Sequence, residues 1–402
     1  MTDSGTTPQL LSPLASFDHQ PRTRLIFGVH SVERVGELAR ELNARKVLLV
    51  TDAGLVAAGH AGHVLRILEA AGLRVTVFDK ALENPTTRCV DECTARAKKS
   101  EIELIVGLGG GSSMDTAKGC NFLLTNGGKM QDYWGVGKAA KPMLPLIAIP
   151  TTAGTGSECQ SSALIADEHT HQKMACLDPK ATARIAILDP ALTVSQPWAV
   201  TAHTGIDAIA HAVETTVTRK RNPLSLMYSH EAFKLTVTSL NRVLTKPDDI
   251  DARGRMLLGA ALAGMAIENS MLGAAHAAAN PLTAHYDIVH GEAVGIMLPA
   301  VVRFNGQDPE VCQAYAELAS APEIACVSDG VRPAWEALVA RLESLLNAAN
   351  IARSLTDCGA ERSMIKTLAG EASKQWTATF NPRPLTVEDF AALYESAFER
   401  RK

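Results

Sequence analysis

The spacing of apolar and polar positions divides the chain into two parts. Before about residue 190, short apolar runs alternate with amphipathic stretches. The runs at 46–52, 74–79, 103–111 and 144–152 are rich in aliphatic and β-branched residues and predict strands, and 63–72 and 89–100 have helical periodicity. Strands that alternate with helices predict βαβ units and a mainly parallel sheet, with ligands at the carboxyl ends of the strands.

Beyond Asp189-Pro190 the strand signal fades. Segments rich in Ala, Leu and Met, such as 253–270 and 336–349, have helical periodicity instead. We therefore predict an α/β dinucleotide-binding domain over residues 1–190 and an all-helical metal-binding and substrate domain over residues 191–402.

Composition limits the classes of partner. The chain has 402 residues, 46% hydrophobic and 20% charged, with a formal net charge of −4 and a pI near 6.3. That charge disfavours a nucleic-acid or anionic-membrane partner. The N-terminus has no cationic segment followed by an apolar one, and the strongest apolar run, 256–267, is too short to span a bilayer. Eight cysteines without a CxxC pair are typical of a reduced protein, so we expect a cytoplasmic location.

Two glycine-containing loops follow predicted strands. GLGGGSSMDTAK (107–118) opens a helix whose N-terminal N–H groups would favour a pyrophosphate, although a plain tight turn is the alternative. Ser112 and Asp115 have capping-box spacing, which places the helix start nearby. The motif is not an ordinary Rossmann fingerprint, because Ser112 replaces the third glycine and the candidate ribose-binding acid, Asp52, lies upstream. The second loop, PTTAGTGSE (150–158), strengthens the prediction of a nucleotide site.

Candidate metal ligands gather in the helical part. Asp207 and His211 are four residues apart and so share a helix face, but such a pair is also common as a surface hydrogen bond. Capping-box spacing between Thr204 and Asp207 predicts that this helix begins at Thr204, with His203 outside it. Glu214, one turn beyond His211, is either a partner that orients this imidazole or a solvated helix residue.

The stretch HAAANPLTAHYDIVHG (276–291) offers three further imidazoles, those of His276, His285 and His290. By contrast, His169 and His171 lie in a polar stretch between two expected strands, and we predict a solvated turn there.

The sequence resembles the iron-containing alcohol dehydrogenases over nearly its whole length. The resemblance is carried in family order by GGGSSMDTAK, PTTAGTGSE, ILDPALT (187–193), GIDAIAHAVE, the 276–291 stretch and FNPRPLTVED (380–389). It implies a dinucleotide-binding α/β domain followed by a helical domain, with a cleft between them in which NAD, a divalent metal and a small primary alcohol or aldehyde meet. The metal it implies is Fe²⁺, with Zn²⁺ as the alternative, since imidazole ligands suit both. It also implies a homodimer or a larger homo-oligomer.

The same resemblance assigns residues. The metal ligands and catalytic centre map onto Asp207, His211, His276 and His290, whereas His285 matches no ligand position. Asn280 stands where the family usually has a histidine near the substrate, which changes the expected proton path and substrate range. The cofactor contacts map onto Asp52, Gly109, Gly110, Ser112, Asp115, Thr151, Thr152, Thr155 and Lys173. A carboxylate at Asp52 favours NAD over NADP, because it accepts hydrogen bonds from a ribose hydroxyl and repels a 2′-phosphate.

Three other functions are weighed against this one. A lyase or cyclase similar to dehydroquinate synthase would need several Lys and Arg for an anionic substrate, and 201–214 and 270–291 contain none. A metal-free reductase similar to maleylacetate reductase is disfavoured because all four ligand positions are filled. A non-catalytic nucleotide-binding protein is disfavoured by the intact ligands and both glycine loops.

Overall fold

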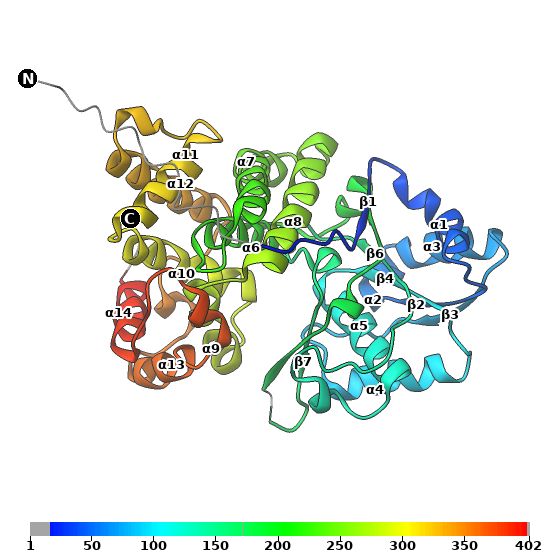
Figure 1. Ribbon diagram of the computed structural model, residues 1–402. Coiled ribbons are helices and arrows are strands. Elements are labelled where there is room, and N and C mark those ends of the chain that lie inside the picture. The colour runs from blue at the N-terminus through cyan, green and yellow to red at the C-terminus, as the bar shows by residue number, and fades with distance from the viewer. Residues whose placement is uncertain (1–16, 171, 400–402) are drawn as a thin grey trace, which may run out of the picture.

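The computed structural model describes residues 17–170 and 172–399. A sheet-containing half, blue to green in Figure 1, lies beside a helical half, green to red. Every strand of the described residues lies before residue 189, and the helices from Trp198 onward form the other half. The predicted fold class, an α/β part followed by a helical part, is confirmed. The residue at which two domains divide stays a prediction.

The main sheet has six strands, all parallel, in the order β1-β9-β6-β4-β2-β3. Four of them occupy the predicted runs. The strands are β1 (Arg24–Phe27), β2 (Lys46–Val50), β3 (Arg74–Phe78), β4 (Leu104–Gly109), β6 (Leu146–Pro150) and β9 (Ile185–Leu188).

Helices cover both faces of this sheet, which is why its central strands are apolar throughout rather than alternating. In β2, Val47 and Leu49 pack with α1 and α3, whereas Leu48 and Val50 pack on the other face with α4 and α5. These side chains are fully buried. The helices of this half are α1 (Val35–Glu41), α2 (Ala53–Ala57), α3 (His60–Ala70), α4 (Thr87–Lys98) and α5 (Gly111–Asn126).

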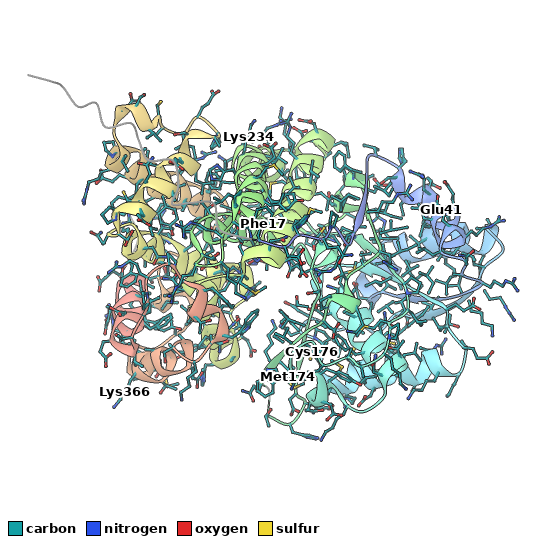
Figure 2. All side chains as sticks on the ribbon, in the orientation of Figure 1. Phe17, Glu41, Met174, Cys176, Lys234 and Lys366 are labelled. Atoms are coloured by element: carbon teal, nitrogen blue, oxygen red, sulfur yellow. The ribbon has the colours of Figure 1, made fainter. Side chains whose placement is uncertain are left out.

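A small second sheet lies beside α5. In it β8 (Lys173–Leu177) pairs antiparallel with β7 (Ser162–Ala166) and parallel with the short β5 (Gly135–Val136). Met174 and Cys176 of β8 are buried, unlike the exposed Lys234 and Lys366 of the helical half (Figure 2).

The connection between β7 and β8 contains the polar stretch that we predicted to be a solvated turn. Asp167 accepts hydrogen bonds from the backbone N–H groups of His169 (3.0 Å) and Thr170 (2.9 Å), and both residues are exposed. His171 lies outside the described residues.

Nine helices of the described chain build the other half around one apolar core. They are α6 (Trp198–Val217), α7 (Pro223–Thr245), α8 (Ile250–Ser270), α9 (Ala274–Tyr286), α10 (His290–Asn305), α11 (Pro309–Ser320), α12 (Val331–Ala348), α13 (Ile365–Ala372) and α14 (Val387–Phe398). In α9 the first two turns are almost entirely alanine, and their methyl groups are fully buried at positions 274, 275, 277, 278 and 279. This helix therefore packs against its neighbours at close backbone distance.

The predicted start of α6 at Thr204 is wrong. The helix begins at Trp198, directly after Pro197, and His203 lies inside it. The Thr204 hydroxyl donates to the carbonyl of Val200 (2.8 Å), one turn earlier, instead of capping the helix. A threonine hydroxyl makes that contact readily within a helix, so capping-box spacing alone does not locate a helix end.

The two halves meet where β9 and the loop after β6 pack on α8, through Cys159, Ala186, Leu188, Leu257 and Ala261. No single helix of the described chain is long and apolar enough to cross a membrane; α8 and α9 meet that test only as a pair, and they are bent by 105°. Residues 1–16, on which most of the prediction about a leader segment rests, lie outside the described part. All eight cysteines are described and are free thiols.

Candidate metal centre and cofactor loops

Asp207 and His211 lie on the buried face of α6, one turn apart. The Asp207 carboxylate oxygen Oδ1 lies 3.4 Å from Nε2 of His211. Both side chains are about 5% exposed, so the pair is an interior feature rather than the surface hydrogen bond that the sequence left open. A buried carboxylate must be compensated by nearby positive charge or donors.

Two further helices direct imidazoles at the same carboxylate oxygen. Asp207 Oδ1 lies 3.3 Å from Nε2 of His276, in the first turn of α9, and 3.8 Å from Nε2 of His290, at the start of α10. The ring of His276 stacks on that of His211, with centroids 4.8 Å apart, and lies 5.4 Å from that of His290. Donor atoms of Asp207, His276 and His290 all lie within 4.8 Å of one another. The structure thus brings all four predicted ligands together.

Close packing at Gly291 holds His290 in place. A Cβ atom at this glycine would collide with the backbone carbonyl of His203 on α6. The start of α10 therefore lies directly against α6, and any larger residue would push His290 away from Asp207.

The hydrogen bonds of His276 show that a cation fits between these residues. Nδ1 of His276 lies 2.5 Å from a carboxylate oxygen of Glu214, an acceptor, so the proton of a neutral imidazole resides on Nδ1 and Nε2 carries a lone pair. Neither this Nε2 nor Asp207 Oδ1 has a hydrogen-bond partner among the described residues, although both are buried. Two acceptors that face each other at 3.3 Å need a proton or a metal ion between them.

Without a metal ion, the charges of the cluster favour a proton in the place between these two atoms. Burial alone would lower the pKa of His276, but the carboxylates of Glu214 and Asp207 raise it to about 9. Burial lowers the pKa of His290 to about 3 and also lowers that of His211, so both are neutral lone-pair donors at pH 7. Burial would raise the pKa of Asp207, yet the three imidazoles hold it below its usual range.

Glu214 is a positioning residue for His276, and so neither of the two alternatives that the sequence left open, a partner of His211 or a solvated residue, is found. It is buried, and its second carboxylate oxygen accepts the backbone N–H of Ala275 (2.7 Å) at the start of α9. The adjacent N–H of Ala274 donates to Asn381 Oδ1 (3.2 Å), and Asn381 exchanges hydrogen bonds with Asn305 (2.8 and 3.1 Å).

Asn381 was not among the predicted site residues. Its motif, FNPRPLTVED, contributes only to the family resemblance, and no spacing in the sequence links residue 381 to the first turn of α9.

Two other polar residues of the 276–291 stretch point elsewhere. His285 is exposed and pairs with Glu371 (2.9 Å). Asn280, one turn after His276, donates to the side-chain carbonyl of Gln375 (3.0 Å). Because an amide does not titrate near neutral pH, Asn280 cannot pass on a proton as a histidine would.

The predicted cofactor loops are adjacent at the carboxyl edge of the sheet, because β4 and β6 are neighbours. The backbone N–H of Thr151 donates to the carbonyl of Gly109 (3.1 Å). Cβ atoms built at Gly110 and Gly111 would lie 3.3 Å from Thr152 and 2.8 Å from Thr155, so only glycine leaves room for this contact.

Asp52 and the start of α5 extend this edge. Asp52 follows β2, caps α2 by accepting from Leu55 N (3.0 Å), and accepts from the Ser113 hydroxyl (3.3 Å). The helix α5 begins at Gly111 with Gly110 as its N-cap, so Ser112 is not the cap; its hydroxyl accepts from the backbone N–H of Asn84 (3.3 Å).

Lys173 and Asp115 interact electrostatically with each other, and Lys173 also with Asp207 of the metal cluster. Burial raises the pKa of Asp115 to about 6, against the ammonium groups of Lys118 and Lys173. Loss of water around its ammonium group lowers the pKa of Lys173, although the side chain as a whole stays exposed, and the charges of Asp115 and Asp207 oppose this shift. The ammonium group of Lys173 thus interacts with one carboxylate from each half.

Comparison with known proteins decides the family. The family model described as iron-containing alcohol dehydrogenase matches residues 21–190, and the model of the C-terminal part of Fe-containing alcohol dehydrogenases matches residues 201–398. The chain belongs to the iron-containing alcohol dehydrogenase family. It is 33% identical to the NAD-dependent methanol dehydrogenase of Bacillus methanolicus, over 92% of this chain and 97% of that protein. A 1,3-propanediol dehydrogenase of Klebsiella pneumoniae is also 33% identical, over 95% and 99%.

Solved structures of iron-containing alcohol dehydrogenases and their relatives have the same fold. A 1,3-propanediol oxidoreductase superposes with a TM-score of 0.92 at 31% identity, over 96% of this chain and 100% of that one. The family match confirms the prediction of an alcohol and aldehyde oxidoreductase.

Proposed function

We propose that the protein is a divalent-metal-dependent dehydrogenase that transfers hydride between a small primary alcohol or aldehyde and NAD(H). The observation that carries this proposal is the convergence of one carboxylate and three imidazoles, with an unpaired oxygen and nitrogen facing each other. We assign Asp207, His211, His276 and His290 as the metal ligands. A divalent ion held there would supply Lewis-acid polarisation of the substrate oxygen.

The residues around the four ligands keep these ligands in position and limit how protons exchange with solvent. Glu214 keeps the proton of His276 on Nδ1, which leaves Nε2 free as a ligand. The close contacts of α9 and α10 with α6 exclude water behind the cluster. The amide of Asn280 holds Gln375 and offers hydrogen-bonding groups that are independent of pH, so proton exchange with solvent must use other groups.

For the cofactor we assign the sheet edge. The backbone N–H groups at Gly109, Gly110 and the start of α5, with Ser112, would bind the pyrophosphate, and Asp115 would accept from a ribose hydroxyl. We assign Thr151, Thr152 and Thr155 to the nicotinamide end and Lys173 to the nicotinamide ribose. The ammonium group of Lys173 interacts electrostatically with the carboxylates of both Asp115 and Asp207. This supports a position of Lys173 between the cofactor and the metal.

Asp52→Asn should shift cofactor preference toward NADP. The substitution removes the negative charge at the adenosine-ribose position and keeps the shape of the side chain. Because like charges in contact cost several kcal/mol, we expect the ratio of kcat/KM for NADP to that for NAD to rise by about 10²-fold. Initial rates with both cofactors and one alcohol measure this ratio.

Glu101→Gln is the matched control. Glu101 pairs with Lys46 at the opposite end of β2. The variant therefore has the same net charge as Asp52→Asn but keeps the negative charge at the adenosine-ribose position. An equal shift in both variants would mean that Asp52 does not face the ribose.

Several finer features belong to the same proposal. We propose Fe²⁺ as the resident metal with Zn²⁺ as a substitute, a cytoplasmic location, and a homodimer or larger homo-oligomer. The relatives named above act on methanol and 1,3-propanediol, and a lactaldehyde reductase of Escherichia coli is 32% identical. These are small neutral substrates, in agreement with the absence of Lys and Arg from 201–214 and 270–291.

The test removes the metal and restores it. Purified enzyme is treated with a chelator, its metal content is measured, and NADH formation is followed with a series of primary alcohols before and after adding Fe²⁺ or Zn²⁺. We expect activity to disappear with the metal, to return with it, and to vary with chain length. An enzyme that binds NAD and metal but oxidises no alcohol would instead favour the lyase-like function.

A further inference from the structure

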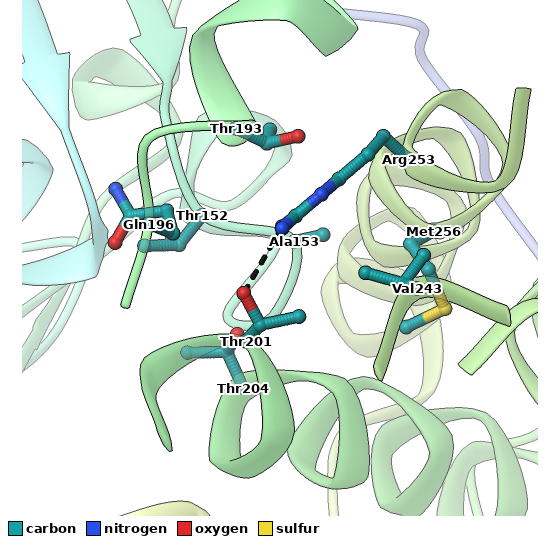
Figure 3. A pocket seen from close by; sticks show the side chains of 9 residues that line it. All are labelled: Thr152, Ala153, Thr193, Gln196, Thr201, Thr204, Val243, Arg253 and Met256. Carbon is teal, nitrogen blue, oxygen red and sulfur yellow. Dashed lines mark hydrogen bonds between the residues drawn. The ribbon is translucent and has the colours of Figure 1, made fainter. Parts of the chain in front are cut away.

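A small pocket lies where the two halves meet, beside the second cofactor loop. Figure 3 shows Arg253 of α8 extending across it toward Ala153 and Thr201. Thr152 of the loop, Thr193 and Gln196 of the connection to α6, and Thr201 and Thr204 of α6 line the remaining walls. No residue in the walls carries a negative charge.

Arg253 is a buried charge, with a 4% exposed surface. Its Nε donates to the carbonyl of Pro247 (2.8 Å) and one Nη1 hydrogen donates to the hydroxyl of Thr201 (3.0 Å). A guanidinium group has five N–H donors, so three remain without an acceptor among the described residues. The guanidinium lies at the end of the side chain, which reaches across the pocket (Figure 3).

No carboxylate of residues 17–170 or 172–399 forms an ion pair with Arg253, and burial is what lowers the pKa of its guanidinium. The carboxylates of Asp249 and Asp251, close in sequence, are both paired with Arg242. Buried charges in proteins are nearly always paired, because an uncompensated one costs several kcal/mol.

Other free donors surround the same space. The Thr201 hydroxyl accepts from Arg253, which leaves its own hydrogen to point elsewhere. The Gln196 amide uses one of its two hydrogens on Thr151 (3.3 Å), which leaves the other free. By contrast, the hydroxyls of Thr193 and Thr204 already donate to backbone carbonyls (2.8 Å each).

The size of the pocket limits its occupant. Its free volume is about 10 Å³, room for the centre of a single water-sized sphere. A phosphate or a carboxylic acid has more atoms than this space admits. We propose that the pocket is a binding site for one small monatomic anion, chloride in solution, held by Arg253 and the hydroxyl of Thr201. The site is separate from the metal centre and does not depend on the proposed function.

Such an ion would lie between three elements. The wall residue Ala153 belongs to the loop after β6, Thr201 to the helix that carries Asp207 and His211, and Arg253 to α8. The bound anion therefore stabilises the junction between the two halves.

Crystals of the metal- and NAD-loaded enzyme soaked in sodium bromide test the site directly. Bromide scatters anomalously, and it replaces chloride at monatomic anion sites. We expect an anomalous peak in contact with the Arg253 guanidinium. Ordinary water density in the pocket, with bromide only at surface positions, would overturn the proposal.

Thermal unfolding in solution provides the second test. At constant ionic strength, sodium chloride should raise Tm above its value in sodium gluconate by about 1–3 °C at tenfold excess over Kd, because gluconate is too large for the pocket. Arg253→Gln should lose this difference. Arg255→Gln, a neighbour on α8 that is exposed and paired with Asp251, should keep it. If wild type and both variants respond alike, the chloride effect arises elsewhere and the assignment is wrong.

Discussion

His276→Ala is expected to lower kcat/KM for alcohol oxidation by at least about 10³-fold and to leave the purified enzyme without stoichiometric metal. The substitution removes one of four donors and also leaves Glu214 without its hydrogen-bond partner at the centre of a buried cluster. The polarising effect of a metal ion is worth several kcal/mol, and each 1.4 kcal/mol is a factor of ten in rate. Metal analysis and steady-state rates on the same preparation measure both effects.

NAD binding separates loss of the metal from loss of the fold. The assigned cofactor contacts lie on the sheet edge and on β8, so His276→Ala should bind NAD with nearly wild-type affinity. His285→Ala is the matched control, because it removes an exposed imidazole from the same helix. Wild-type metal content in His276→Ala would contradict the assignment of His276 as a ligand.

Glu214→Gln should give an intermediate result. An amide can accept the His276 hydrogen bond but carries no charge, and loss of such supporting contacts commonly costs 10–100-fold in metal affinity. Titration of the metal-free variant with Zn²⁺ gives the affinity. An unchanged affinity would mean that Glu214 merely packs the interior.

Lys118→Met is expected to lower the free energy of unfolding by about 3–5 kcal/mol. Lys118 is fully buried, and its ammonium group donates to the Ser157 carbonyl (2.6 Å) and hydroxyl (3.0 Å) and to the carbonyls of Gln160 (2.8 Å) and Ser162 (3.0 Å). Methionine has a similar length but offers no donor, so these acceptors would stay buried and unpaired.

Urea denaturation measures this loss as a lower midpoint at unchanged slope. Lys234→Met is the control: Lys234 is exposed on α7, and surface substitutions usually change stability by less than about 0.5 kcal/mol. A comparably small change in Lys118→Met would show that water replaces the lost ammonium group. Burial also raises the pKa of neighbouring Glu158 to about 7, so loss of the Lys118 charge should raise it further.

How much the sequence could predict depended on the distance between partners along the chain. Four of the six strands of the main sheet and the shared helix face of Asp207 and His211 follow from local periodicity and were predicted, whereas β1 and β9 were not. The contact between Glu214 and His276 joins residues 62 positions apart, whereas helical spacing offered only His211 or solvent as the neighbour of Glu214. The start of α6 was misplaced because the capping-box pattern at Thr204 was stronger locally than the proline that precedes Trp198. No local sequence pattern pointed to Asn381 or Arg253, because the contacts of both residues form only where segments distant in the sequence pack together.

The alanines of α9 restrict how this enzyme can evolve. Their fully buried methyl groups leave no space, and enlarging a residue in a well-packed interior typically costs 1–3 kcal/mol and shifts the backbone. A shift of α9 moves His276 relative to Asp207, so a larger residue here harms metal binding before it alters the substrate pocket. Laboratory selection for bulkier alcohols should therefore leave positions 274–279 unchanged. Adaptive substitutions should accumulate at exposed positions away from the ligands, such as Trp376, where the side chain can vary without moving a ligand.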